Sequence, residues 1–272
     1  ESIMEKVMKL RSLVIGVSVS LIMLASFQSS AEEEWGFIGE VGTSHKDVTF
    51  EGVEGESGDA INFNPKLLTL DYAGAFFYQN FYTHLKVSQT IKDDSTLDDV
   101  NSIVTMSRYD MDITLGYYVG SGFSVFTGYK SGELEAFVFG DAARIGTGAD
   151  PTEPNPDSNT QASFKDDGPF IGVSYLLPMD ESSFSFSFAY ADMDGKITIT
   201  NGGDGGGGGT TTGSTTGFSY SASWNKPVSD QTSFVAALNV IRYTYDDTAG
   251  LGLDFSADQS FDNISLALRH YF

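Results

Sequence analysis

The chain has 272 residues, with 15 Lys and Arg against 37 Asp and Glu, so its formal net charge is −22. This balance argues against a nucleic-acid partner, because phosphates require a basic surface. The absence of Cys excludes a disulfide framework, a thiolate metal site, a cysteine nucleophile and a lipid anchor on Cys. The 30 Gly, 21 Phe and 13 Tyr favour tightly paired strands over helices.

The first 31 residues have the pattern of an export signal. Three basic residues precede an apolar run over 13–27, and small residues occupy the −3 and −1 positions of a cleavage site after Ala31. We therefore expect 1–31 to be a cleaved signal peptide with upstream residues, and 32–272 to form one domain. A membrane anchor is the alternative, but the uncharged stretch 12–31 contains Ser18, Ser20, Ser26 and Gln28 and is barely long enough to span a bilayer.

From Trp35 onward, apolar residues alternate with small or polar ones. In the segment 183–190, the even positions are aromatic and the odd positions are Ser or Ala. A period of two indicates strands with one apolar and one polar face. The pattern predicts ten strands, near residues 35–49, 66–79, 81–92, 102–119, 123–134, 168–177, 183–193, 216–225, 232–245 and 259–272.

The links between these strands alternate in character. Short links fall near 79–80, 120–122, 178–182 and 226–231, and long polar links near 50–65, 93–101, 135–167, 194–215 and 246–258. Short turns on one rim, long loops on the other and an even strand count are typical of bacterial outer-membrane barrels. We therefore predict an all-β fold, a closed antiparallel transmembrane β-barrel of about ten strands, with eight or twelve as alternatives.

Strand parity assigns each side chain to the lipid or to the lumen. Large apolar residues such as Ile113 and Ile171 are expected to face lipid, and the aromatic residues beside the short turns to form a girdle. The opposite parity gives the candidates for a lumen constriction: Glu40, Asp71, His84, Lys86, Arg108, Asp110, Asp112 and Lys130. Four of them, Asp71, Lys86, Asp112 and Lys130, alternate in charge at similar heights, which indicates either a salt-bridge network that plugs the barrel or a constriction that selects solutes.

The alternation continues into the ending Arg269-His270-Tyr271-Phe272. With the signal peptide and the sorted links, this ending resembles the small outer-membrane β-barrel superfamily of Gram-negative bacteria, which includes OmpA-like, OmpW-like and opacity-type barrels. The resemblance implies an outer-membrane location and contacts with outer-membrane lipid and lipopolysaccharide. It also implies biogenesis through periplasmic chaperones and the barrel-assembly machinery, with the assembly signal in Ile264, Leu266, Leu268, Tyr271 and Phe272.

Catalysis is not expected. Omptin proteases are similar in strand number, but their pattern needs a His near the fourth loop, and none of the three His of this chain lies there. Ser44 and His45 with Asp47 are the only local Ser/His arrangement. No pair of His has metal-ligand spacing and no loop matches an EF-hand, so neither a metal nor a cofactor is expected.

The function that these patterns predict is a porin-like narrow channel or a structural barrel for small solutes, with small solutes or cations as possible ligands. The alternative is a non-conducting surface recognition or adhesion protein that acts through the long acidic loops, because loops on rigid scaffolds carry function. The Gly-rich segment 205–209 is expected to be a mobile loop tip.

Overall fold

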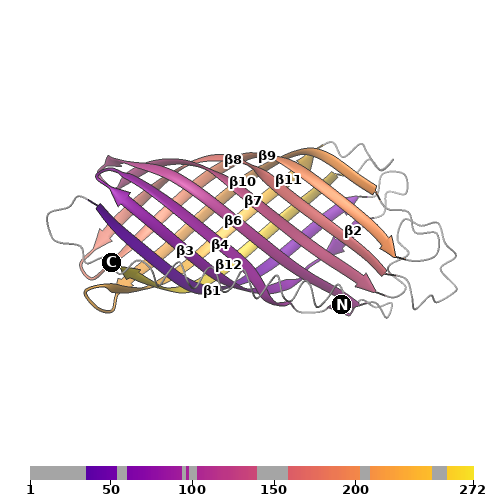
Figure 1. The fold of residues 1–272 in the computed structure, drawn as a ribbon, viewed down its shortest axis with the longest axis horizontal. Coiled ribbons are helices and arrows are strands. Elements are labelled where there is room, and N and C mark those ends of the chain that lie inside the picture. Colours follow the sequence, from indigo (N-terminus) through magenta and orange to yellow (C-terminus); the bar gives the residue numbers. More distant parts are fainter. Residues whose placement is uncertain are drawn as a thin grey trace, which may run out of the picture.

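The computed structural model describes residues 35–53, 60–93, 96–97, 103–139, 159–202, 209–246 and 256–272. They form one antiparallel sheet of twelve strands, ten of which close into a barrel (Figure 1). Within these ranges no helix is long and apolar enough to cross a membrane. The expected signal peptide lies outside the described residues.

The ten barrel strands follow one another around the ring in chain order. Their bounds are β1 (Trp35–Val53), β3 (Lys66–Tyr78), β4 (Phe81–Asp93), β6 (Ile103–Gly120), β7 (Phe123–Phe139), β8 (Asn159–Met179), β9 (Ser182–Gly202), β10 (Gly209–Pro227), β11 (Thr232–Asp246) and β12 (Ser256–Tyr271). Two short strands, β2 (Ala60–Phe63) and β5 (Thr96–Leu97), pair with β1 and β6 near their outer ends. The predicted all-β fold with about ten strands is therefore confirmed.

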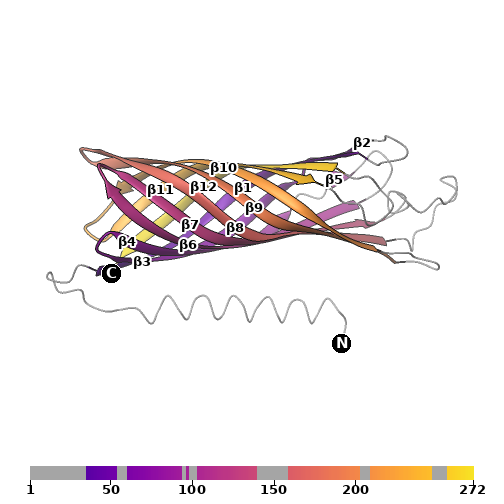
Figure 2. The ribbon, with the colours of Figure 1, turned by 90° about the horizontal axis from the view of Figure 1, so that it is seen from above.

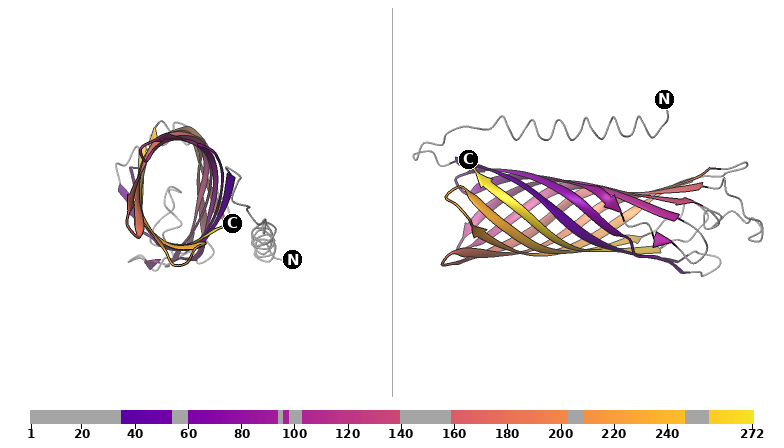
Figure 3. Two further views of the ribbon diagram at one scale, coloured as in Figure 1. Left: turned by 90° about the vertical axis from the view of Figure 1, so that its left-hand side faces the viewer. Right: turned by 90° about the horizontal axis from the view of Figure 1, so that it is seen from below.

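The barrel closes between its first and last strands. The register pairs Ile38 with Tyr271 and Val41 with Leu268, which confirms that the last strand completes the ring (Figure 3). The register can be followed from partner to partner around the ring. It starts at Ile38 of β1 and returns to β1 at Phe50, which is 12 residues further along the strand. For ten strands this stagger tilts the strands by about 40°.

The four short turns lie together at one end of the barrel (Figure 2). The β3–β4 and β6–β7 turns each hold a residue in the left-handed region, Gln79 with φ 54° and Ser121 with φ 52°. Such angles match the twist of tight hairpins, in which Asn, Asp and Gly are the usual residues. The predicted short links 79–80 and 120–122 are therefore confirmed as hairpin turns.

The strands extend further from the short turns than predicted. β7 reaches Phe139 and β8 starts at Asn159, while β9 reaches Gly202 and β10 starts at Gly209. The predictions of loops over 135–167 and 194–215 were therefore wrong in their bounds, because backbone pairing continues where the side-chain pattern changes. The Gly-rich tip is described only at Gly209, the first residue of β10.

The change of pattern divides the barrel into two zones. Near the turns the outward side chains are large and apolar, as in Leu238 and Ile171, which are 56% and 64% exposed. Further along β9 the outward residues are Asp192 and Asp194, while Met193 is buried inside. The apolar side chains thus point outward at the turn end of the strand and inward at its loop end.

The boundary between the zones runs at one level around β9 to β12. Outward apolar residues are followed by outward polar ones at Tyr190/Asp192, Phe218/Thr216, Val240/Arg242 and Ile264/Asp262. About four outward positions per strand lie on the turn side of this boundary, which at about 3.3 Å per residue and the tilt above spans roughly 20 Å. That height is close to the apolar band of about 25 Å in outer-membrane barrels.

Candidate functional site in the barrel lumen

Near the turns, two unlike walls face each other across the lumen. On β4 to β8, aromatic rings lie over glycines of the neighbouring strands, because a Cβ at Gly116, Gly128 or Gly172 would collide with Tyr82, Phe170 or Phe126, respectively. On β9 and β10 the inward positions are Ser, joined by the hydrogen bonds Ser185–Ser223 and Ser187–Ser221, each 2.6 Å. This part of the lumen combines an aromatic wall with a hydroxyl wall.

Beyond this region, charged side chains from three strands, β1, β6 and β7, meet around Asp110 on β6. Oδ2 of Asp110 lies 3.0 Å from Nζ of Lys46, and Oδ1 lies 2.7 Å from Nη2 of Arg108. The Nζ of Lys130 lies 3.4 Å from the same Oδ1. A single carboxylate therefore contacts three cations, and its burial makes each interaction stronger than it would be in water.

A second carboxylate, Asp71 on β3, is held by hydroxyls. It accepts hydrogen bonds from Ser44, Ser88 and Thr69, and the Nζ of Lys86 lies 3.9 Å from its Oδ2. The Nζ of Lys46 also donates to Ser88, at 2.9 Å, which links the two carboxylate groups into one network. These contacts satisfy polar atoms that would be costly to bury without partners.

The third carboxylate, Asp112, accepts a hydrogen bond of 3.0 Å from Lys130 and pairs in register with Lys86. We call Lys46, Asp71, Lys86, Arg108, Asp110, Asp112 and Lys130 the charged layer. Six of its seven members are among the candidates that the sequence singled out.

The remaining candidates lie closer to the turns. Glu40 on β1 pairs with Arg269 on β12, at 2.8 Å between Oε2 and Nη2. His84 on β4 lies in register between Ala75 and Thr114, on the lumen parity. Sequence reasoning missed Lys46, although it shares the parity of Glu40 on the same strand and could have been found by extending that count.

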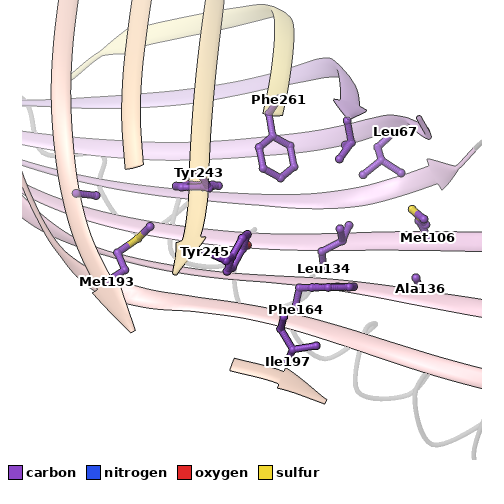
Figure 4. Close-up of a cluster of buried hydrophobic side chains, with 12 residues drawn as sticks. Leu67, Met106, Leu134, Ala136, Phe164, Met193, Ile197, Tyr243, Tyr245 and Phe261 are labelled. Atoms are coloured by element: carbon purple, nitrogen blue, oxygen red, sulfur yellow. The ribbon is translucent and has the colours of Figure 1, made fainter. Parts of the chain in front are cut away.

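An apolar cluster fills the lumen on the loop side of the charged layer (Figure 4). We call it the apolar plug, and its large members are Leu67, Met106, Leu134, Phe164, Met193, Ile197, Tyr243, Tyr245 and Phe261. The ring of Phe261 joins the two groups, because the guanidinium carbon of Arg108 lies 4.1 Å above its centroid. Of these inward residues, Phe164 and Ile197 lie in the segments 135–167 and 194–215 that were predicted as loops, and the switch of parity is the signal that would have located them.

Solvent exposure falls steeply along the lumen. The side chain of Arg269 is 30% exposed, that of Lys130 12% and that of Arg108 2%, and Leu134 in the plug is fully buried. A cavity of about 40 Å³ remains beside the charged layer, between Arg108 and Asn263. Along the described strands, the lumen is therefore accessible near the turns and filled at the charged layer and the plug.

Comparisons with known proteins agree with this architecture. No family model and no curated protein sequence matches the chain. The outer-membrane protease OmpT from Escherichia coli is similar in structure, with a TM-score of 0.63 at 9% identity over 91% of this chain and 99% of that one. The translocator domain of the autotransporter NalP from Neisseria meningitidis has a TM-score of 0.51 at 10% identity over 98% of both chains.

The chain has the fold of the outer-membrane β-barrels. At these identities the likeness concerns the fold alone, so the activities of a protease and a translocator stay with those two proteins.

The Ser/His arrangement of this outer-membrane barrel fold does not form a catalytic pair. Ser44 points into the lumen and donates to Asp71, whereas His45 faces outward and its Nε2 lies 3.1 Å from Asp47. Neighbouring residues of a strand point to opposite faces, so the two side chains cannot meet. Among the described residues, no group of three His, Cys, Asp or Glu side chains is placed to hold a metal ion.

Proposed function

We propose that this protein is a non-conducting structural barrel of the outer membrane. Its lumen is closed by its own side chains, and its polar outer zone stands above the lipid as a rigid platform for the loops. Of the functions that the sequence predicted, this is the structural barrel rather than the porin-like channel.

The outward surface supports the membrane location. A closed barrel pairs every strand with two neighbours, as lipid requires, and the band below the zone boundary exposes large side chains such as Leu115, Val173 and Leu268. The short turns then lie in the periplasm and the longer links outside the cell, with lipopolysaccharide as the lipid at the outer boundary. Periplasmic chaperones and the barrel-assembly machinery are the partners proposed for biogenesis.

The filled lumen is the observation that carries the proposal. A solute path must cross both the charged layer and the plug, where Arg108, Asp166 and Leu134 have almost no exposed surface. The remaining cavity has room for only a few water molecules. Barrels of about this strand number have interiors that side chains fill. The charged residues therefore act as cross-links between strands rather than as a selective constriction.

Single-channel recording in planar bilayers tests the proposal. The refolded wild-type barrel should give no current steps, whereas a variant that shortens the plug, Phe164→Ala with Tyr245→Ala and Phe261→Ala, should give measurable conductance if it remains folded. Heat-modifiable gel mobility checks that it does. The matched control removes three outward side chains of the lipid band and should give no current steps. It combines Phe186→Ala, Tyr220→Ala and Leu238→Ala. Regular steps from the wild-type protein would refute the closed lumen.

A further inference from the structure

The small cavity beside the charged layer is lined mainly by hydrogen-bond donors. Its polar lining includes four cations from β1, β4, β6 and β7, and two amides from β11 and β12, the strands that follow β1 across the seam: Lys46, Lys86, Arg108, Lys130, Asn239 and Asn263. The carboxylates that reach it are Asp110 and Asp112, and the other buried carboxylates, Asp71 and Asp166, do not line it. The surface of the cavity therefore carries more positive than negative charge.

Two of the lining side chains have unused hydrogen-bonding capacity. Among the described residues, Nη1 of Arg108 and Oδ1 of Asn263 have no hydrogen-bond partner, although both residues are more than nine-tenths buried. The guanidinium uses Nε and Nη2 on Asp110, so Nη1 is its free donor. Asn239 and Asn263 are paired in register and share one wall, and an amide turned about its last bond presents NH₂ instead of oxygen. Buried polar atoms without partners are uncommon in proteins, and a bound ion would satisfy them.

We propose that this cavity binds a monovalent anion of halide size, chloride in the cell envelope. A space of about 40 Å³ admits a small anion. The anion accepts hydrogen bonds from Nη1 of Arg108 and from the amide wall, beside the four cations of the lining. Lys86, whose side chain is 32% exposed, lies on the side from which the ion arrives.

This inference rests on the proposed closed lumen and adds a ligand that stabilises it. The anion joins Arg108 on β6 with the amides on β11 and β12, so it connects strands that are not neighbours in the ring. Removal of the anion should therefore loosen the charged layer without changing the strand pairing.

Thermal unfolding in matched salts tests the site. The midpoint for the refolded barrel, followed by heat-modifiable mobility at one ionic strength, should be about 3–6 °C higher in sodium chloride or bromide than in sodium gluconate. That shift is expected for a ligand at about ten times its dissociation constant. Equal midpoints in chloride, bromide and gluconate would overturn the proposal.

Two variants and a control make the readout specific. Arg108→Lys keeps the charge but removes Nη1, and Asn263→Leu replaces the amide by an apolar side chain of similar shape; both should lose the halide dependence. Arg242→Lys alters an exposed arginine that pairs with Asp262 on the outer surface, and it should keep the dependence.

Crystals grown in bromide give a direct observation, because an anomalous peak is expected between Arg108 and Asn263. A peak of water only, with no anomalous signal, would overturn the proposal. Failure of the closed lumen would appear separately, as current steps from the wild-type barrel in planar bilayers.

Discussion

The Nζ of Lys46 lies 3.0 Å from Oδ2 of Asp110, although two further strands, β3 and β4, separate β1 from β6 along the wall. The pair therefore crosses the lumen instead of following the hydrogen-bonded ladder. Because Asp110 also contacts Arg108 and Lys130, one carboxylate connects the inward faces of β1, β6 and β7. This arrangement accounts for the closed state of the lumen at this level.

Asp110→Asn should destabilise the barrel strongly. The substitution leaves Lys46, Arg108 and Lys130 buried without their shared counter-charge, and breaking a buried ion pair in this way costs about 3–5 kcal/mol. The free energy of unfolding in urea, measured in lipid vesicles, checks this. Asp262→Asn is the control, because its pair with Arg242 is solvent-exposed and contributes at most about 1 kcal/mol. Equal losses for the two variants would show that Asp110 is not central to the network.

Leu134→Ala should lower the free energy of unfolding by about 2–5 kcal/mol, as for a fully buried leucine in a protein core. The plug lies above the lipid band, so it behaves as the core of a water-soluble barrel. The same urea titration measures the change, with Thr216→Ala on the outward face at the boundary as the control. A loss below 1 kcal/mol for Leu134→Ala would mean that the plug is not tightly packed.

The zone boundary predicts opposite responses to an added charge. Leu238→Arg places a cation in the middle of the lipid band and should cost about 2–4 kcal/mol, whereas Thr244→Arg, on the same face of β11 beyond the boundary, should cost close to nothing. Both side chains face outward, so the difference between the two losses in free energy of unfolding measures the effect of lipid. Similar losses at the two positions would contradict the placement of the boundary.

Phe272→Ala should slow the folding of the barrel. The Phe272 ring packs on Phe37 with centroids 5.5 Å apart and covers Gly39, and its backbone N donates to the carbonyl oxygen of Phe37 at 3.0 Å. These contacts join the last strand to the first at the seam that closes the ring. The rate of appearance of the heat-modifiable form in vesicles is the measurement, with Phe186→Ala, an outward aromatic residue of β9 away from the seam, as the control. An unchanged folding rate would show that Phe272 does not contribute to closure of the ring.

Much of this barrel follows from local pattern. The period of two identified strands, and the alternation of short and long links gave their number and the shared end of the turns, because a hairpin needs little more than suitable turn residues such as Gln79 and Asn80. Parity also indicated which side chains of 35–53 and 103–120 face inward, since neighbouring residues must point to opposite faces.

The tertiary structure decided what the lumen contains. Whether Lys46 reaches Asp110 depends on the register of four strands and on the stagger of the whole ring, neither of which any single strand encodes. The strand extensions were missed for the same reason, because Phe164 and Ile197 make sense as inward residues only once the other strands supply the rest of the plug. The sequence by itself determined the strands and their two faces, whereas closure of the ring decided that one face becomes a packed core above the lipid and a charged layer at its edge.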